Sequence, residues 1–308
     1  MANMVHYPSL ASLSDVDIVG ICDLDDARLQ NTADRFGITG RFRDYRAMVE
    51  QTNPQAIYVI GQPHLMFDIW VWCLEHHLPL FIEKPMGLTW HQARILADLA
   101  ETYDCVTQVG FQRRSSPMVT QLYQRCIEKG AINLAVCSFY KDSVKPFRNA
   151  RDHILDDAVH AIDTLRWLGG GEVTRVVSTT RRIQVPDINL VAALIEFDTG
   201  VVGMLMNNWA SGRRCFSVEI HALGIWVQAE HEQGAVVYED GQDQGTAWDA
   251  RQVAGSPEFY VYGGFQAKHR EFIDAVKAHT LPSSHFGDAL KTMEVAERIL
   301  AHDLLGVR

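Results

Sequence analysis

The sequence predicts an α/β protein, with a doubly wound parallel sheet in its first half and an α+β domain with a large, mainly antiparallel open sheet in its second half. In the first half, short apolar runs alternate with segments of helical periodicity, which is typical of parallel strands joined by helical crossovers. In the second half, consecutive long strands are separated by short turns, as in antiparallel sheets.

The first half contains four expected strands, and each ends at polar or glycine residues, where parallel sheets hold their ligand sites. These strands span 16–22, 56–60, 78–82 and 106–109, and the expected helices span 26–36, 65–76 and 89–103. Gly37 stands where a helix is expected to end. Thr89 and Gln92 have the spacing of a capping box at the start of the third helix.

The second half begins with an expected helix at 117–129, a strand at 134–140, a polar, basic loop and a helix at 154–168. The strands expected after it are 173–184, 190–197, 201–209, 215–222, 225–230 and 235–239. Turn sequences such as Asp198-Thr199-Gly200 separate them. Two helices, 264–279 and 287–304, end the chain.

The composition is that of a globular protein, with 308 residues, 47% hydrophobic and 21% charged. The formal net charge of -10 argues against nucleic acid or an anionic membrane as a partner. No apolar stretch approaches the ~20 residues that span a bilayer, and the N-terminus has no export-signal pattern. Six cysteines lack pairing rhythm and Cys-x-x-Cys spacing, so we expect reduced thiols, a cytoplasmic location and no metal.

Five motifs occur in a characteristic order along the chain: Asp23 at a strand end, Pro63-His64, Glu83-Lys84-Pro85, Gly110-Phe111-Gln112-Arg113-Arg114, and Asp156-x-x-x-His160. In this order and spacing the chain resembles the Gfo/Idh/MocA family of NAD(P)-dependent oxidoreductases over almost its whole length. The resemblance implies a Rossmann domain, then an α/β domain whose open sheet mediates oligomerisation as a homodimer or homotetramer. It also implies hydride transfer between nicotinamide and a sugar, polyol or related carbonyl compound.

The resemblance places the dinucleotide-binding domain at 1–114 and the substrate domain at 115–308, with the last helix able to pack back on the first domain. The chain departs from the family at its start. Met1 to Pro8 resembles the family's first helix, so the Rossmann sheet is missing its first strand. Ala2 falls where the third small residue of the glycine-rich fingerprint belongs, close to the ~20-residue spacing expected before Asp23. We expect that the natural protein is longer; the alternative is a chain that has lost cofactor binding.

Lys84 is the first candidate catalytic residue. An ammonium beside the substrate oxygen stabilises a developing alkoxide while hydride leaves the same carbon, and it can relay a proton. The alternative is a strand-end lysine that extends to solvent. Glu83 is expected to orient Lys84 or to contact the cofactor, unless it is an ordinary surface carboxylate.

His160 and Asp156 lie four residues apart, which places them on one face of a helix. Histidine is the natural acid–base group near neutral pH, and Asp156 could hold its imidazole or bind a substrate hydroxyl. The alternative is a structural i,i+4 pair. A metal bound by the cluster His153, Asp156, Asp157 and His160 is a weaker alternative because no further ligand spacing is present.

The residues around this helix also depart from the family, since Ala150-Arg151-Asp152 and Ala158 stand where glycines are usual. The substrate site could therefore be shaped differently. The preceding loop carries four cations in an otherwise acidic chain, namely Lys141, Lys145, Arg148 and Arg151. They could clamp a carboxylate or phosphate of the substrate, or form a solvated basic loop.

Asp23 is expected to accept hydrogen bonds from the adenosine ribose, which favours NAD over NADP. Its alternative role is that of an acid near a helix N-terminus. By the resemblance, Pro63, His64 and Gln112 line the nicotinamide and ribose, and Arg113 reaches cofactor or substrate. Three further side chains are weaker candidates for substrate contacts: Asn207, Trp209 and Tyr260.

Taken together, the residues predict an oxidoreductase that transfers hydride between NAD and a hydroxyl or keto group of a sugar, cyclitol or sugar derivative. Lys84, His160 and Asp156 are its expected catalytic residues, and the same three with Arg113 contact the substrate. The alternative function is a non-catalytic family member that binds a metabolite or regulates a partner.

Overall fold

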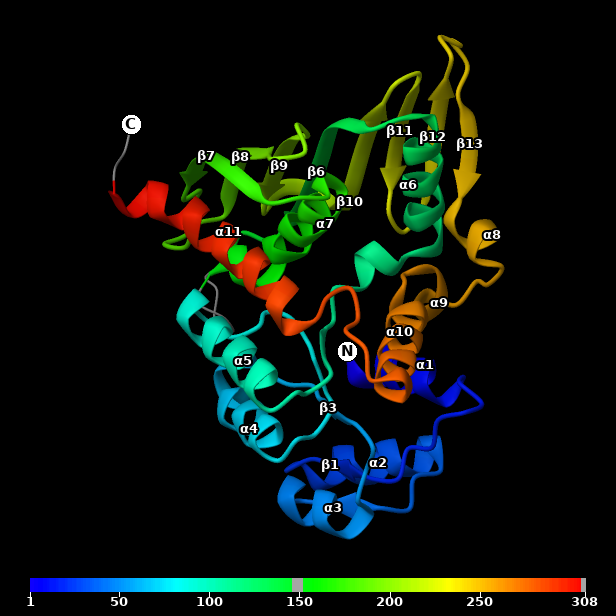
Figure 1. Ribbon diagram of the computed structural model, residues 1–308, viewed down its shortest axis with the longest axis vertical. Helices are drawn as coiled ribbons and strands as arrows, with labels where there is room; N and C mark the ends of the chain where they lie inside the picture. Colours follow the sequence, from blue (N-terminus) through cyan, green and yellow to red (C-terminus); the bar gives the residue numbers. More distant parts are fainter. Residues whose placement is uncertain (146–151, 306–308) are drawn as a thin grey trace.

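The computed structural model describes residues 1–145 and 152–305. Figure 1 shows the large mixed sheet in the upper part of the molecule and the short parallel strands with their helices in the lower part. Among the described residues, none of the helices has the length and apolar character needed to cross a membrane.

The N-terminal half contains five short parallel strands in two sheets. β1 (Ile21–Cys22) pairs with β2 (Arg41–Phe42), and β3 (Ile57–Val59), β4 (Leu80–Ile82) and β5 (Thr107–Val109) pair in that order. Within the described residues, no backbone pairing joins the two sheets. The predicted doubly wound parallel arrangement is confirmed. The strand that precedes Asp23, β1, belongs to the smaller sheet, and the strand that precedes Pro63, β3, belongs to the larger one.

Helices connect these strands, and several begin or end where local signals predicted. The helices are α1 (Tyr7–Ala11), α2 (Asp26–Phe36), α3 (Tyr45–Thr52), α4 (Pro63–Glu75) and α5 (Trp90–Thr102), preceded by a π-helical turn, η1 (Ala2–His6). The Asp25 carboxylate caps the start of α2, and Gly37 ends it at φ 67°. Thr89 accepts a hydrogen bond from the Gln92 amide at the start of α5, as its capping spacing predicted.

The second half is built on one sheet of eight strands with the order β13-β12-β11-β10-β6-β9-β8-β7. Its strands are β6 (Ile132–Asp142), β7 (Val173–Arg181), β8 (Leu190–Phe197), β9 (Val202–Asn208), β10 (Ala210–Ala222), β11 (Ile225–Glu230), β12 (Gly234–Glu239) and β13 (Thr246–Asp249). Every neighbouring pair is antiparallel except β6 and β9, which run parallel. The predicted, mainly antiparallel open sheet is therefore confirmed.

Helices of the second half pack against this sheet or against the first half. They are α6 (Pro117–Lys129), α7 (Val159–Gly169), α8 (Ala250–Ala254), α9 (Phe259–Tyr262), α10 (Phe265–Ala278) and α11 (Phe286–Leu305), with short turns η2 (Gln112–Ser115) and η3 (Ile154–Ala158). α11 packs against α5, α7 and β7. The last helix thus returns to elements of the first half, while the division at residue 114 stays a prediction.

A buried ion-pair network fixes η2 against α7 and α11. Arg114 donates to both carboxylate oxygens of Asp163 and to Asp288, and Arg166 also donates to Asp288. Arg114 and Asp163 are buried, so each charge depends on the other to offset its lost hydration. This network holds the turn that carries Gln112 and Arg113.

Candidate active site

Two neighbouring parallel strands bring the predicted motifs together. Ile82 at the end of β4 pairs with Val109 at the end of β5, so Glu83-Lys84 and the segment from Gly110 to Arg113 leave the sheet side by side. A Cβ added to Gly110 would lie 2.4 Å from Oε1 of Glu83. The absence of a side chain at residue 110 thus makes the space that the Glu83 carboxylate occupies.

Glu83 faces the N-terminal helical segment. Its Oε1 lies 3.2 Å from Nε2 of His6, whose Nδ1 lies 3.0 Å from Nε2 of His269. Both imidazoles are buried. The structure therefore gives Glu83 a histidine neighbour, and no contact between its carboxylate and Lys84 is seen among the described side chains.

A cavity of about 500 Å³ opens at this end of β4 and β5. Its lining residues are Met1, Met4, Glu83, Lys84, Gln112, Arg113, Phe139, Lys141, Asp157, His160, Arg214, Glu232, Phe259 and Phe265. Five predicted site residues, Glu83, Lys84, Gln112, Arg113 and His160, meet in it. The other five, Ala2, Asp23, Pro63, His64 and Asp156, are not among the described residues that line it.

Asp156 lies beside Lys84. The Lys84 ammonium donates to the backbone carbonyl of Asp156 and lies 3.7 Å from its carboxylate. No hydrogen bond or ion pair joins Asp156 to His160 among the described residues, and the role of Asp156 as a partner of His160 or of a substrate hydroxyl stays a prediction.

The π-helical turn at residues 154–158 directs Asp157 into the cavity. Its carboxylate accepts hydrogen bonds from Lys141 at 2.5 Å and from the indole Nε1 of Trp209 at 3.1 Å. Burial would raise the pKa of Asp157, but Lys84, Lys141 and the two hydrogen bonds together hold it below its usual value. Asp157 is therefore ionised at neutral pH and holds the Lys141 ammonium in an ion pair.

His160 lies on the cavity wall in the first turn of α7 and is buried. Its Nδ1 has no hydrogen-bond partner among the described residues. Burial, followed by the positive charges of Lys84 and Arg113, lowers the pKa of His160 well below its ordinary value. The imidazole is thus neutral at pH 7.

Arg113 is buried beneath aromatic rings. Its guanidinium carbon lies 3.7 Å from the centroid of the Phe216 ring and 5.2 Å from that of Phe139. Burial lowers the pKa of Arg113 to about 10, so the group stays charged at neutral pH. Its Nη1 lies 3.7 Å from Oε1 of Glu232, outside hydrogen-bond distance.

Several cavity residues were not singled out from the sequence, among them Phe139, Arg214 and Glu232. Phe139 and Phe216 are paired across β6 and β10, and Arg214 lies in the irregular part of β10. The sequence signal for Arg214 was the doublet Arg213-Arg214 directly before the strand expected at 215–222. Sheet register decides that its second member reaches the cavity.

The remaining predicted cofactor residues lie at other strand ends. Asp23 follows β1, accepts a hydrogen bond from the Asp25 amide at 2.9 Å and lies 3.3 Å from Nη1 of Arg28. Pro63 and His64 begin α4, after β3. Ala2 lies in η1, beside Met1 and Met4, which line the cavity.

The weaker candidates have mixed positions. Trp209 is buried, donates to Asp157 and stacks on His153 with ring centroids 4.9 Å apart. Asn207 is buried, whereas Tyr260 is partly exposed. In residues 1–145 and 152–305, no group of three or more histidine, cysteine or acidic side chains could hold a metal ion.

The basic loop can be followed only in part. Lys141 reaches the cavity and Lys145 is exposed, whereas Arg148 and Arg151 lie outside the described residues. All six cysteines are free thiols, and four of them are buried.

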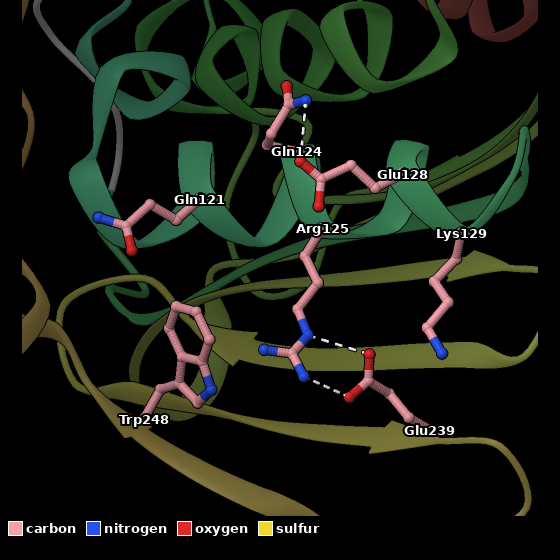
Figure 2. Close-up of a pocket in the computed structure, with 7 residues that line it drawn as sticks. All are labelled: Gln121, Gln124, Arg125, Glu128, Lys129, Glu239 and Trp248. Carbon is pink, nitrogen blue, oxygen red and sulfur yellow. Dashed lines mark hydrogen bonds and ion pairs between the residues drawn. The ribbon is translucent and has the colours of Figure 1, made fainter.

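A second concavity, of about 490 Å³, lies between α6 and the strands β12 and β13. Figure 2 shows that Arg125 donates to both carboxylate oxygens of Glu239 across it, with Trp248 beside the pair. Its central cation is already neutralised, and the predicted residues lie elsewhere. We therefore place the site at Lys84 and His160.

Comparison with known families agrees with this geometry. Residues 1–111 match the family model described as "Oxidoreductase family, NAD-binding Rossmann fold", and residues 130–224 match the "GFO/IDH/MocA C-terminal domain". The chain belongs to the Gfo/Idh/MocA family. The family and the fold class predicted from the motif order are thereby confirmed, and the predicted NAD cofactor agrees with the family description.

Curated relatives of this Gfo/Idh/MocA protein include two inositol dehydrogenases. The chain is 22% identical over 218 residues to myo-inositol 2-dehydrogenase of Thermotoga maritima, covering 66% of this chain and 64% of that protein. It is 24% identical over 206 residues to scyllo-inositol 2-dehydrogenase (NAD(+)) of Bacillus subtilis, covering 63% of this chain and 60% of that protein. The matched region thus spans less than two thirds of either relative.

Solved structures support the fold of this family member over nearly its full length. A dehydrogenase from Chromobacterium violaceum has a TM-score of 0.90 at 23% identity, covering 99% of this chain and 92% of that one. A levoglucosan dehydrogenase in complex with NADH has a TM-score of 0.85 at 19% identity, covering 99% and 95%.

Proposed function

We propose that this protein is an NAD-dependent oxidoreductase that transfers hydride between the nicotinamide and a hydroxyl or keto group of a sugar, cyclitol or sugar derivative. The observation that carries the proposal is the presence of Lys84 and the neutral His160 in one cavity at the carboxyl ends of β4 and β5. Ligands of open parallel sheets bind at this end of the strands.

The cavity residues fit the nicotinamide end of NAD. Oε1 of Gln112 is buried and has no hydrogen-bond partner among the described residues, so it leaves an acceptor for the amide group of a ligand. Gln112, Arg113 and Glu83 would hold this end, and Asp23, Pro63, His64 and Ala2 are proposed as further cofactor contacts. Bound NAD would supply the hydride acceptor.

The protein side chains would handle the proton and the charge. The Lys84 ammonium is held by the Asp156 carbonyl near the cavity, where it can stabilise negative charge on the substrate oxygen. His160 is neutral and can accept the hydroxyl proton. Asp157 fixes Lys141 on the same wall, and Asp156 acts by positioning Lys84.

The test is a titration of this chain with NAD by calorimetry, followed by turnover assays with inositols and sugars. The panel includes sugar acids as sugar derivatives, and we expect saturable NAD binding and NADH formation with at least one of its compounds. A chain that binds no NAD and turns over none of these compounds would favour the non-catalytic alternative.

We further propose that the protein self-associates through the exposed face of its large sheet. Val177, Leu194 and Met204 are neighbours across β7, β8 and β9, and with Val202 and Met206 they form an apolar patch with 36–41% exposure each. Contiguous exposed apolar residues of this kind mark association sites. Met204→Glu should therefore reduce the mass measured by light scattering, whereas Leu223→Glu, at an exposed turn, should not.

The six free thiols support a reducing location such as the cytoplasm.

A further inference from the structure

Three cations of the cavity gather around one aromatic ring. The centroid of the Phe139 ring lies 4.9 Å from Nζ of Lys141, 5.2 Å from the guanidinium carbon of Arg113 and 5.7 Å from that of Arg214. They come from β6, η2 and β10, so the fold brings them together from distant parts of the sequence. In a chain with a formal net charge of -10, this concentration of positive charge is local.

The acids beside these cations do not balance them. Arg214 donates to both oxygens of Glu232 at 2.7 and 2.9 Å, and the same carboxylate is the nearest acid to Arg113. Lys141 is paired with Asp157. Two carboxylates therefore serve three cations on this wall, which leaves one positive charge in excess.

Arg113 is the cation that lacks a full set of acceptors. Its Nε and Nη1 are buried and have no hydrogen-bond partner among the described residues, although its side chain is only 4% exposed. Leaving the N–H groups of a buried charged side chain without acceptors is costly. The cavity wall is thus arranged for an acceptor that carries negative charge.

We propose that this wall, formed by Arg113, Lys141 and Arg214 around Phe139, binds a carboxylate of the substrate, so that the substrate class is a sugar acid rather than a neutral polyol. The reaction at Lys84 and His160 rests on the function proposed above, whereas acid binding itself does not. One excess positive charge matches a single carboxylate better than a doubly charged phosphate.

The test compares each acid with its neutral amide of nearly the same shape. D-Glucuronate, D-galacturonate and D-gluconate, their amides, myo-inositol and D-glucose 6-phosphate are titrated against the full chain by calorimetry, with and without NAD. We expect at least one acid to bind about tenfold or more tightly than its amide and to weaken as KCl is raised. Binding of every acid no tighter than its amide, no saturable acid binding, or tighter binding of the phosphate would overturn the proposal.

Variants locate the effect in the wall. Arg214→Gln and Lys141→Gln should each weaken acid binding by about tenfold and leave amide binding unchanged. The matched control is Arg213→Gln, because Arg213 is the adjacent residue, pairs with Glu230 at the surface and does not line the described cavity. An equal loss of acid binding in the control would overturn the assignment. Acid binding without NAD-dependent turnover would contradict only the proposed function, and turnover of neutral polyols without acid binding would contradict only this inference.

Discussion

The indole Nε1 of Trp209 donates a hydrogen bond to the Asp157 carboxylate across 3.1 Å. Trp209 is fully buried and lies between β9 and β10, while Asp157 lies in the π-helical turn before α7. This bond therefore ties the large sheet to the turn that positions the cavity acids. It also fixes the acid that accepts from Lys141.

Trp209→Phe tests this tie, because phenylalanine keeps an aromatic ring against His153 but removes the donor. Hydrogen bonds to charged acceptors contribute about 2 kcal/mol, so we expect a loss of that order in the free energy of unfolding by urea. The matched control is Trp226→Phe, whose indole lies 3.4 Å from the more exposed Glu219. An equal loss in both variants would contradict a special role for the Asp157 bond.

Lys84→Ala is expected to reduce kcat/KM about a hundredfold or more, because a removed donor to a developing oxyanion costs that much in other enzymes. NAD affinity should change less. Lys291→Ala is the control, since this lysine is exposed and pairs with Glu172 at the surface. Turnover of Lys84→Ala within about threefold of the parent would remove Lys84 from the mechanism.

Arg114→Ala should destabilise the fold by about 3–5 kcal/mol, because it leaves the buried Asp163 carboxylate without its cation. Burial raises the pKa of Asp163, and the Arg114 guanidinium opposes that rise. Arg43→Ala breaks an exposed pair with Asp26 and should cost less than about 1 kcal/mol. Urea unfolding of both variants checks the difference.

The sequence predicted the helices whose ends are marked by local signals. α6 begins and ends as predicted, at Pro117 and Lys129. α2 does so as well, since the cap at Asp25 and the glycine at 37 are adjacent in sequence to the helix they delimit. The two-residue strand β2 was not predicted, because so short a run carries no periodicity.

The candidate site was predictable only where motifs mark it. Lys84 and Gln112 follow strands that can be recognised in the sequence, and His160 follows from the family resemblance. Arg214 reaches the cavity from an irregular part of β10, where the register with β6 shifts between Ala210 and Cys215, and no local pattern encodes this shift. Asp157 lines the described cavity and was not predicted to do so, because it lies in a π-helical turn for which the sequence carries no signal.

Buried histidines should make the protein less stable in mild acid. Burial, together with the positive charge of Arg113, lowers the pKa of His231 to about 3, and burial lowers those of His160 and His269 well below the ordinary value. Below the unfolded pKa of about 6.5, the unfolded chain binds protons that the folded chain excludes, so stability falls as pH decreases. Above that pH both states are neutral and these groups contribute no slope.

The expected slope is up to about 1.4 kcal/mol per pH unit for each such histidine between pH 6.5 and 5, a window above the usual pKa of carboxylates. Urea unfolding across this window measures it. His231→Gln should remove the contribution of one histidine to this slope, because glutamine does not titrate. Its amide can donate to the Arg113 carbonyl that His231 contacts at 3.3 Å. His279→Gln is the control, since His279 is exposed; an unchanged slope in His231→Gln would show that His231 binds protons equally in both states.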